Sequence, residues 1–467
     1  MPERVRDYLY YDSAVSLCAT CYRRVDAKVV IKDDRVYLDK RCADHGAARV
    51  LIAEDAAYYR RAREQFLKPS EMPQRFNTPV KWGCPYDCGL CADHEQHSCV
   101  SIVEVTDHCN LACPVCYSES GPHRPQHRSL ATITAMLDAI VRNEGEPDVV
   151  QISGGEPTIH PQFFEIMDAA RARPIRHLML NTNGLRIANE PGFARRLAEY
   201  APGFEIYLQF DSLKEHPLRR MRGADLRDVR RRALDHLNEL DLSTTLVVTV
   251  QRGVNDGELG GIIDFALEQR CVRGVTLQPI QEAGRLADYD PEHDRLTLTG
   301  IRRRVLEQTS VFLPEDIVPV PCHPDCIAMA YAIRNGSDVA ALTRYLDPQV
   351  LVDSARNTIT FERDPGLRDK LFECLSTGHG PAGGAASLKQ LLCCLPGVDA
   401  PDLHYRDVFR LIIMEFLDAQ SFDVRSVRKS CVHIAHPDGR LIPFDTYNLF
   451  YRDDLETTRL DPLRNGR

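Results

Sequence analysis

Seventeen cysteines stand mostly in short groups along this 467-residue chain, and this grouping constrains the fold more than any other feature. The groups are Cys18/Cys21/Cys42, Cys84/Cys88/Cys91/Cys99, Cys109/Cys113/Cys116, Cys322/Cys326 and Cys393/Cys394/Cys431. A single cysteine often serves as a small buried apolar residue, which does not explain such clusters. Structural disulfides are rare in a reducing compartment, so the groups predict metal ligation. Cys271 and Cys374 stand alone and are expected to be core residues.

Composition and charge bound the classes of function. Hydrophobic residues make up 43% and charged residues 27%, as in globular proteins, and no apolar run has the length of a membrane-spanning helix. The N-terminus lacks the apolar core of a signal peptide. A net charge of −9 disfavours nucleic acid as a partner, and the Arg-rich stretch 219–232 is expected to be a solvated helix face. We expect a cytoplasmic protein without a transmembrane segment; peripheral contact with a membrane surface stays open.

Between residues 100 and 279 short β-branched apolar runs alternate with amphipathic stretches, which predicts repeated βα units. The expected strands are 101–106, 149–153, 177–183, 205–211, 244–250 and 274–279. The expected helices are 130–141 behind a Ser129 cap, 162–172, 193–200, 226–240 and 258–269. Six such units form a partial (β/α)6 barrel, an α/β fold whose chemistry lies at the C-terminal strand ends.

The length predicts two or three domains. We expect a cysteine-rich N-terminal region over residues 1–99, with one hairpin turning at Asp33-Asp34, and the barrel over 100–299. A mixed C-terminal domain should follow over 300–467.

Cys109, Cys113 and Cys116 form a C-x3-C-x2-C loop directly after the first barrel strand. Three thiolates would hold three irons of a [4Fe–4S] cluster and leave the fourth iron open to another ligand. The spacing alone also suits a zinc loop or an ordinary ferredoxin loop.

Gly154-Gly155-Glu156-Pro157 ends the second strand, where glycines let a ligand approach the backbone. With this motif following the cysteine loop, residues 100–280 resemble the radical S-adenosylmethionine (SAM) superfamily. The resemblance implies that SAM chelates the open iron and that Gly154, Gly155 and Glu156 hold its amino group. It further implies reductive cleavage of SAM to a 5′-deoxyadenosyl radical, with an external electron donor of the flavodoxin or ferredoxin type.

Polar residues at further strand ends are candidates for SAM contacts. Asn183, Gln209 and Asp211 are the preferred ones, and Arg222 is a weaker candidate for the SAM carboxylate. The alternative is that these side chains only form turns and helix caps.

Three further cysteine groups predict additional metal sites. Cys84, Cys88 and Cys91 repeat the cluster spacing, with Cys99 as fourth ligand of an auxiliary cluster or a structural zinc. Two knuckles, Cys18/Cys21 and Cys42/His45, flank the hairpin and suit one structural zinc or iron. In the last third, a second auxiliary cluster would take Cys322, Cys326, Cys394 and Cys431.

The knuckles, the 83–91 loop, the barrel and the ending 430–440 together resemble the methanogen-type family of tetraether lipid synthases, also described as radical SAM dihydropterin methyltransferases. The resemblance implies three cubane clusters, one mononuclear metal and chemistry on an unactivated carbon. One departure is Asp445, which stands where some members carry a further cysteine.

The leading hypothesis is an enzyme that acts on an unactivated C–H bond and couples lipid alkyl chains. The alternative within the same chemistry is a methyltransferase for a pterin or another small heterocycle. A different class, a multi-cluster electron-transfer or zinc-stabilised binding protein, has no need of the Gly154-Gly155-Glu156 loop.

Overall fold

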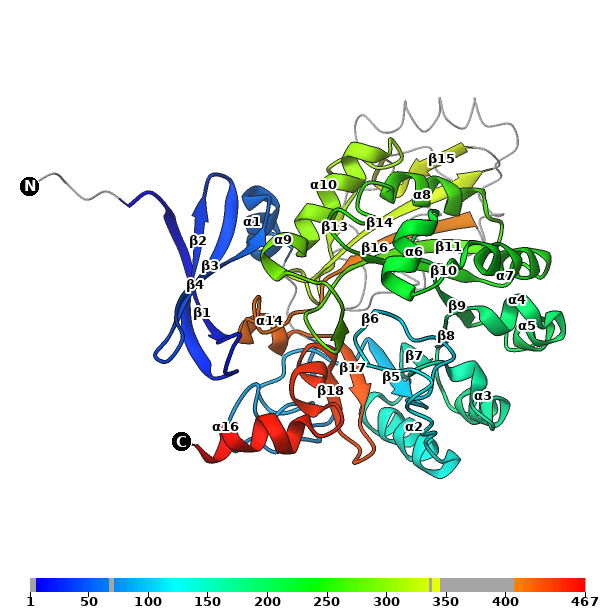
Figure 1. Cartoon of the computed structure of the whole chain (residues 1–467), viewed down its shortest axis with the longest axis horizontal. Coiled ribbons are helices and arrows are strands. Elements are labelled where there is room, and N and C mark those ends of the chain that lie inside the picture. The colour runs from blue at the N-terminus through cyan, green and yellow to red at the C-terminus, as the bar shows by residue number, and fades with distance from the viewer. Residues whose placement is uncertain (1–5, 67–70, 336–337, 345–406, 467) are drawn as a thin grey trace, which may run out of the picture.

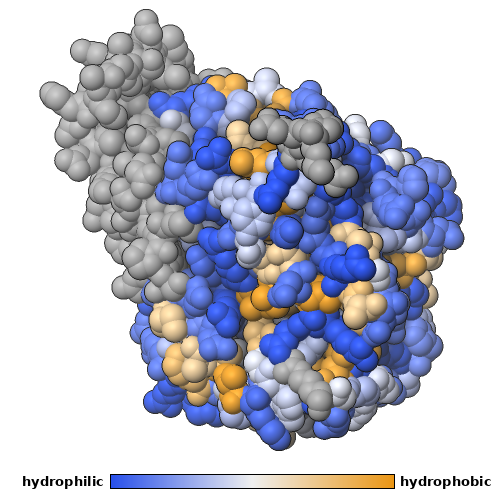
Figure 2. Space-filling view, turned by 90° about the vertical axis from the view of Figure 1, so that its left-hand side faces the viewer, coloured by the Kyte–Doolittle hydropathy of each residue, from blue (hydrophilic) through white to orange (hydrophobic). Residues whose placement is uncertain are grey.

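A computed structural model describes residues 6–66, 71–335, 338–344 and 407–466 (Figure 1). The predicted ligand Cys394, its neighbour Cys393, and Cys374 lie outside these ranges. Within them no helix is both long enough and apolar enough to cross a bilayer. One face of the molecule is mainly hydrophilic, with hydrophobic side chains in scattered groups (Figure 2).

The N-terminal region is a four-stranded antiparallel sheet with one helix. Its strands β1 (Leu9–Leu17), β2 (Arg24–Lys32), β3 (Arg35–Cys42) and β4 (Gly46–Ala53) pair in sequence order, and α1 (Ala56–Glu64) follows. The predicted hairpin is confirmed: Asp33 and Asp34 have φ of 52° and 58°, the left-handed conformations of a tight two-residue turn. β1 and β4 were not predicted. β4 is largely exposed and its buried and exposed residues do not alternate, so it lacks the usual pattern of a strand.

The predicted βα units are confirmed. Six strands pair in parallel as neighbours: β5 (Val100–Glu104), β7 (Val149–Ser153), β8 (His177–Thr182), β9 (Phe204–Gln209), β10 (Thr244–Val250) and β11 (Val272–Pro279). The connecting helices are α2 (Leu130–Glu144), α3 (Phe163–Arg171), α4 (Leu185–Asn189), α5 (Pro191–Ala198), α6 (Glu215–Arg222), α7 (Arg227–Glu239) and α8 (Leu259–Glu268). Most of them lie along the outer side of the curved sheet (Figure 1), whereas α6 lies beside the segment of Cys113 and Cys116, with Arg222 Nη1 donating to Val115 O at 3.3 Å. Ser129 caps α2 by accepting a hydrogen bond from Thr132 N at 3.2 Å, as expected.

The C-terminal third extends this sheet at both edges. β16 (Val408–Met414) lies parallel to β11, and β17 (Val432–Ala435) lies parallel to β5. Beyond them the sheet continues with antiparallel β14 (Ile327–Asn335), which also pairs with β13 (Val318–Pro319) and β15 (Asp338–Ala341), and with β18 (Leu441–Pro443) beside β17. In the described ranges this path runs from β13 to β18.

The remaining described elements lie outside the two large sheets. They are β6 (Val115–Cys116) paired with β12 (Arg285–Leu286), α9 (Pro291–Asp294), α10 (Leu298–Gln308), α14 (Val424–Arg428), α15 (Phe444–Thr446), α16 (Asp461–Asn465), the 3-10 turns Pro157–Ile159 and Leu342–Arg344, and two π-helical segments, Tyr447–Tyr451 and Glu456–Leu460.

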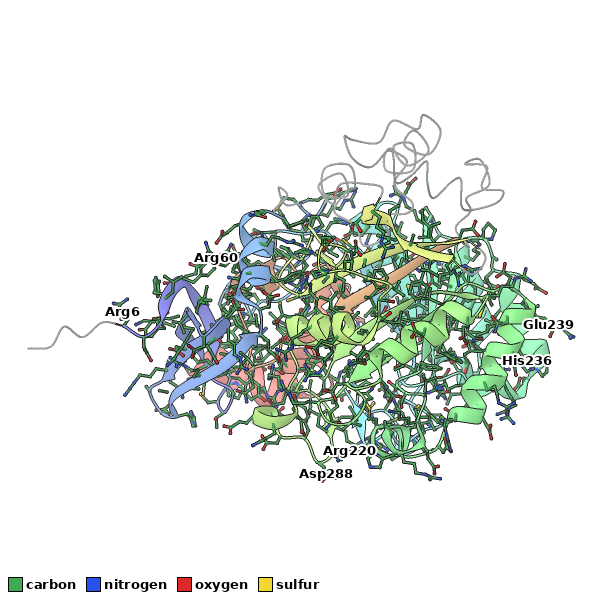
Figure 3. The ribbon with its side chains drawn as sticks, turned by 90° about the horizontal axis from the view of Figure 1, so that it is seen from above. Arg6, Arg60, Arg220, His236, Glu239 and Asp288 are labelled. Atoms are coloured by element: carbon green, nitrogen blue, oxygen red, sulfur yellow. The ribbon has the colours of Figure 1, made fainter. Side chains whose placement is uncertain are left out.

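The Arg-rich stretch 219–232 is only partly the solvated face that its composition predicts. Figure 3 shows Arg220 near the outer edge of the molecule, and this residue is exposed. Arg222, however, has a side chain that is only 12% exposed, and Arg230 is 2% exposed. These two guanidinium groups enter the barrel interior.

Candidate active site and metal centres

The three cysteines of the first cluster loop line a cavity at the C-terminal ends of the barrel strands. Cys109 and Cys113 are buried and Cys116 is partly exposed. Burial raises the pKa of the Cys109 thiol to about 12 and also raises that of Cys113. Buried thiols do not ionise readily by themselves, but a bound metal deprotonates them. The loop therefore suits metal ligation.

The glycine turn after β7 packs directly against the backbone that precedes Cys109. Gly155 N donates to Thr106 O at 2.8 Å and Glu156 N donates to His108 O at 2.9 Å. Gly154 has φ of +126°, and a Cβ there would lie 2.4 Å from Thr106 O. At Gly155 a Cβ would lie 2.2 Å from His108 O. Only glycine permits this approach, so both positions hold the turn beside the cysteine loop.

Glu156 joins the glycine turn to the end of β8. Its carboxylate accepts hydrogen bonds from Thr182 Oγ1 and Asn183 N, both at 2.8 Å, and from Thr158 N and Oγ1 at 3.1 and 2.6 Å. Burial raises the pKa of this carboxyl group. Four protein donors thus occupy the side chain, and its contact with a SAM amino group stays a prediction.

The predicted SAM contacts differ in where they lie. Asn183 and Gln209 line the cavity. Asn183 Nδ2 donates to Asn110 Oδ1 at 2.7 Å, and Gln209 Nε2 donates to Asn181 Oδ1 at 3.0 Å. Asp211 is fully buried and is not among the lining residues. It accepts hydrogen bonds from Arg222 Nε at 2.7 Å and Nη2 at 2.6 Å, so it fixes Arg222.

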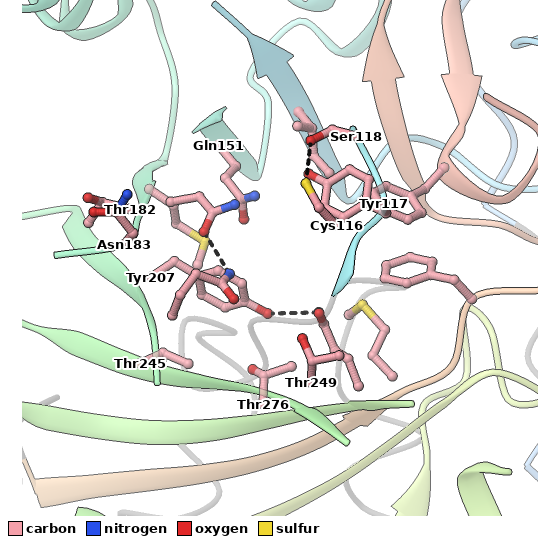
Figure 4. Close-up of a pocket in the computed structure, with 18 of the residues that line it drawn as sticks. Cys116, Tyr117, Ser118, Gln151, Thr182, Asn183, Tyr207, Thr245, Thr249 and Thr276 are labelled. Atoms are coloured by element: carbon pink, nitrogen blue, oxygen red, sulfur yellow. Dashed lines mark hydrogen bonds between the residues drawn. The ribbon is translucent and has the colours of Figure 1, made fainter. Parts of the chain in front are cut away.

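The cavity has a volume of about 200 Å³ and spans the depth of the barrel. Its apolar lining comes mainly from strands near the two ends of the parallel run. Its polar lining comes mainly from the strands between them. The apolar residues include Val100, Ile102, Ile412, Met414 and Val432, and the polar ones include Tyr207, Thr245, Thr249, Thr276 and Gln278. Figure 4 shows Tyr207 and the threonines on one side and Cys116 and Tyr117 on the other.

A buried ionic cluster closes the cavity at the N-terminal strand ends. Glu205 accepts from Arg410 Nη2 at 2.8 Å on each oxygen, lies 3.1 Å from His177 Nε2, and accepts from the Thr245 hydroxyl. Burial alone would raise the pKa of Glu205, but the Arg410 guanidinium and His177 hold it well below its ordinary value. This cluster was not predicted. The only signal was the charged residues inside otherwise apolar strand runs.

The N-terminal knuckles converge as expected. The ligand atoms of Cys18, Cys21, Cys42 and His45 all lie within 4.8 Å of one another. Cys21 Sγ is 3.8 Å from Cys42 Sγ, and His45 Nδ1 is 3.6 Å from Cys18 Sγ and 3.5 Å from Cys42 Sγ. A tetrahedral zinc with ordinary bond lengths separates sulfur atoms by about 3.8 Å and sulfur from nitrogen by about 3.5 Å. The geometry fits one tetrahedral metal.

The second cysteine loop holds Cys84, Cys88 and Cys91. The Cys88 thiol, hydrogen-bonded to Cys84, and burial together raise the pKa of Cys84 well above its usual range. Thr446 Oγ1 lies 2.9 Å from Cys88 Sγ. Trp82, just before this loop, contacts Lys81 and Arg464 through its ring.

The spacing predicts that Cys99 lies with Cys84, Cys88 and Cys91, but the structure places it elsewhere. Its sulfur lies instead within 4.8 Å of those of Cys322 and Cys431. Strand pairing is the cause: Val100 of β5 is opposite Val432 of β17, and Val100 N donates to Cys431 O at 3.0 Å. Each cysteine precedes its strand, so parallel pairing places the two side by side.

Asp445 lies near this second group but is held by protein donors. Its carboxylate accepts from Leu417 N at 2.5 Å and from Ser430 Oγ at 3.1 Å. Burial raises its pKa. Cys326 lies outside the group that Cys99, Cys322 and Cys431 form.

Comparisons with known proteins agree with this geometry. The description "Radical SAM superfamily" matches residues 103–266, and "HMPTM N-terminal zinc ribbon domain" matches residues 10–54. The barrel, the three-cysteine loop and the glycine turn thus define a radical SAM enzyme.

The 7,8-dihydro-6-hydroxymethylpterin dimethyltransferase of Methanocaldococcus jannaschii is 30% identical over 97% of this chain and 96% of its own length. The GTP 3′,8-cyclase of Alkaliphilus oremlandii is 26% identical over 59% of this chain and 81% of its own. Among solved structures, that of Streptococcus suis SuiB covers 44% of this chain and 45% of its own, with 15% identity and a TM-score of 0.38. The chain belongs to the family of the M. jannaschii enzyme within the radical SAM superfamily. Membership implies SAM, a [4Fe–4S] cluster and an external reductant.

Proposed function

We propose that this protein is a radical SAM methyltransferase that acts on a pterin or another small heterocycle. The similarity to the M. jannaschii pterin dimethyltransferase over nearly the whole of both chains carries this proposal. The bound cluster would supply the electron that cleaves SAM to its 5′-deoxyadenosyl radical. The protein's own residues bind, orient and enclose the reactants.

The lining of the cavity supports a heterocyclic substrate. A flat ring with nitrogen and oxygen atoms at its edge needs apolar contacts on its faces and hydrogen-bonding groups around it. Ile412 and Met414 offer the first, while Tyr207, Thr276 and Gln278 offer the second. Gln278 Nε2 donates to Tyr207 Oη at 3.2 Å, which keeps this polar wall ordered.

The residues near the mouth would form the cofactor site. In this proposal Cys109, Cys113 and Cys116 hold the cluster that binds SAM, Gly154 and Gly155 admit the SAM amino group, and Asn183 and Gln209 contact the nucleoside. Two auxiliary cubanes are proposed, one on Cys84, Cys88 and Cys91 and one on Cys99, Cys322 and Cys431. The knuckles Cys18, Cys21, Cys42 and His45 would hold one zinc or iron that stabilises the N-terminal sheet.

Coupling of lipid alkyl chains is the second candidate. The apolar side chains from β5, β16 and β17 favour it, because an alkyl chain needs a continuous apolar wall. The ionic cluster at the floor disfavours it, because an alkyl terminus cannot replace water around charged groups.

Deuterium transfer distinguishes the candidates. The anaerobic holoenzyme would be incubated with SAM, reductant and either a deuterated dihydropterin or a lipid deuterated along its chains. Hydrogen abstraction places deuterium in 5′-deoxyadenosine, so label from the pterin is expected. Label from the lipid alone would establish the second candidate. Unlabelled nucleoside, formed at the same rate with and without either compound, would contradict both.

A further inference from the structure

Arg230 is a buried cation whose donors are not fully used. It lies on α7, is 2% exposed, and is among the residues that line the cavity with Cys109 and Cys113. Its Nη1 donates to the backbone oxygen of Asn183. Its Nε and Nη2 are buried and have no hydrogen-bond partner in the described part of the chain.

Such an arrangement is unfavourable unless a ligand completes it. A buried donor without an acceptor costs about 1–3 kcal/mol, and more when it is charged. Burial lowers the pKa of Arg230 to about 10, so the group still carries its charge at neutral pH. The nearby carboxylate of Glu156 already accepts from four protein donors, so it does not complete the set.

The second guanidinium group that lines this cavity, that of Arg222, does have protein acceptors for its donors. Arg222 donates through Nε and Nη2 to both oxygens of Asp211 at 2.7 and 2.6 Å. It also donates to Thr249 Oγ1 at 3.0 Å and to Val115 O at 3.3 Å. The edge of Arg222 that binds a carboxylate is therefore taken by Asp211, whereas the same edge of Arg230 has no acceptor in the described residues.

We infer that Arg230, and not Arg222, binds the carboxylate of SAM. The Nε–H and Nη2–H bonds of a guanidinium are parallel and match the two oxygens of one carboxylate. This is the edge of Arg230 that has no protein acceptor. Arg230 lines the same cavity as Cys113 and Gly154 and is bonded to Asn183, so it faces the space that a cofactor held by the cysteine loop would occupy. The assignment rests on the cofactor of the superfamily and is independent of the substrate.

The test compares SAM with decarboxylated SAM, which lacks only the carboxylate. Dissociation constants for both would be measured by calorimetry on the anaerobically reconstituted holoenzyme. Arg230→Met should weaken SAM binding by roughly 10–100-fold, the loss expected for a charge-assisted pair. It should change binding of decarboxylated SAM by less than about two-fold, because that ligand offers Arg230 no partner. Equal losses for the two ligands, or no loss for SAM, would overturn the assignment.

Arg232→Met is the matched control, because Arg232 is an exposed residue of the same helix, with its Nη2 bonded to Asn189. It should leave both constants unchanged. Iron content and the visible spectrum report that the cluster is intact in each variant. If Arg230→Met does not load iron, Arg230→Lys replaces it. Lysine keeps the charge and loses the paired donors, so a reduced preference for SAM is expected. The full wild-type preference in that variant would refute the paired contact.

Discussion

Cys431 Sγ lies 3.6 Å from Cys322 Sγ, although 109 residues separate them in the chain. With Cys99 they form one group, so single serine variants at these positions should lose the same metal. Cys99→Ser and Cys322→Ser should each remove about four irons, one cubane, and the double variant should lose no more than either. Iron and sulfide analysis of the reconstituted protein measures this.

Two comparisons make that prediction specific. Cys99→Ser combined with Cys84→Ser should remove about eight irons, because the structure places these cysteines at different sites. Cys271→Ser, in the core beside β11, should remove none. If the double variant of Cys99 and Cys84 loses only one cubane, Cys99 is instead a ligand at the same site as Cys84.

Gly154→Ala should abolish SAM binding while the cluster still forms. A methyl group at this position would lie 2.4 Å from Thr106 O, and its φ of +126° disfavours any side chain. The turn must then move away from Cys109. Equilibrium dialysis with SAM measures the loss. Gly257→Ala is the control, because nothing lies within 4 Å of its added methyl group. Full SAM binding by Gly154→Ala would contradict the proposed site.

Glu205→Gln should lower the free energy of unfolding by roughly 3–5 kcal/mol, since it leaves Arg410 buried beside a neutral group. Chemical denaturation of the holoenzyme measures this. The double variant with Arg410→Met should lose less than the two single variants together, because no charge then stays unpaired. Asp228→Asn removes the exposed partner of Arg231, where the side chains are 82% and 68% exposed. It should change stability by less than about 1 kcal/mol.

The carboxylate of Glu205 also predicts how the free energy of unfolding changes with pH. The pKa of Glu205 in the fold lies well below its ordinary value of 4.5, so the unfolded chain binds the proton first as the pH falls. The stabilisation is complete above 4.5 and is lost as the pH falls below it towards the pKa in the fold. The stability difference between wild type and Glu205→Gln should therefore be largest near pH 7 and shrink below pH 4.5. A difference that grows in acid would contradict the ion pair.

Removal of the knuckle metal should melt the N-terminal sheet before the barrel. Cys18→Ala takes away one of four converging ligands, and metal binding at such a site is coupled to folding. Differential scanning calorimetry should show a lower transition for this variant. Cluster content and SAM binding should be retained, since Cys18 lies outside the cavity. Loss of SAM binding with unchanged melting would reverse the assignment of a structural role.

The six parallel strands were predictable because each leaves a local signal. β10 and β11 are runs of β-branched and apolar residues, and α2 begins at a serine that caps it. The helix α4 was missed because five residues carry too little periodicity, and α6 was missed because its charged residues leave few apolar positions to show a period. The pairing of β16 with β11 has no local signal at all. It depends on a contact between segments more than a hundred residues apart.

Some residues of the candidate site could likewise be predicted from the sequence, and others could not. Cys109 and Gly154 stand in motifs that can be read directly, and the structure brings their segments together. Cys99 could not be assigned, because a spacing of eight residues from Cys91 suggests one loop whereas strand pairing carries it to Cys431. Arg230 looked like one of many surface arginines. Its burial depends on the packing of α7 over the end of β8.

The pairing of β5 with β17 also sets an order of events during synthesis. Cys99 leaves the ribosome 332 residues before Cys431, the difference of their positions in the chain. At ordinary rates of translation this amounts to roughly 15–65 s. Throughout that interval β17 is not yet present to pair with β5, and the thiol of Cys99 has no Cys431 beside it. Delivery of iron to the proposed cluster of Cys99, Cys322 and Cys431 would consequently follow the synthesis of Cys431, and an arrested or shortened chain would keep the Cys99 thiol without its partners and one edge of β5 uncovered.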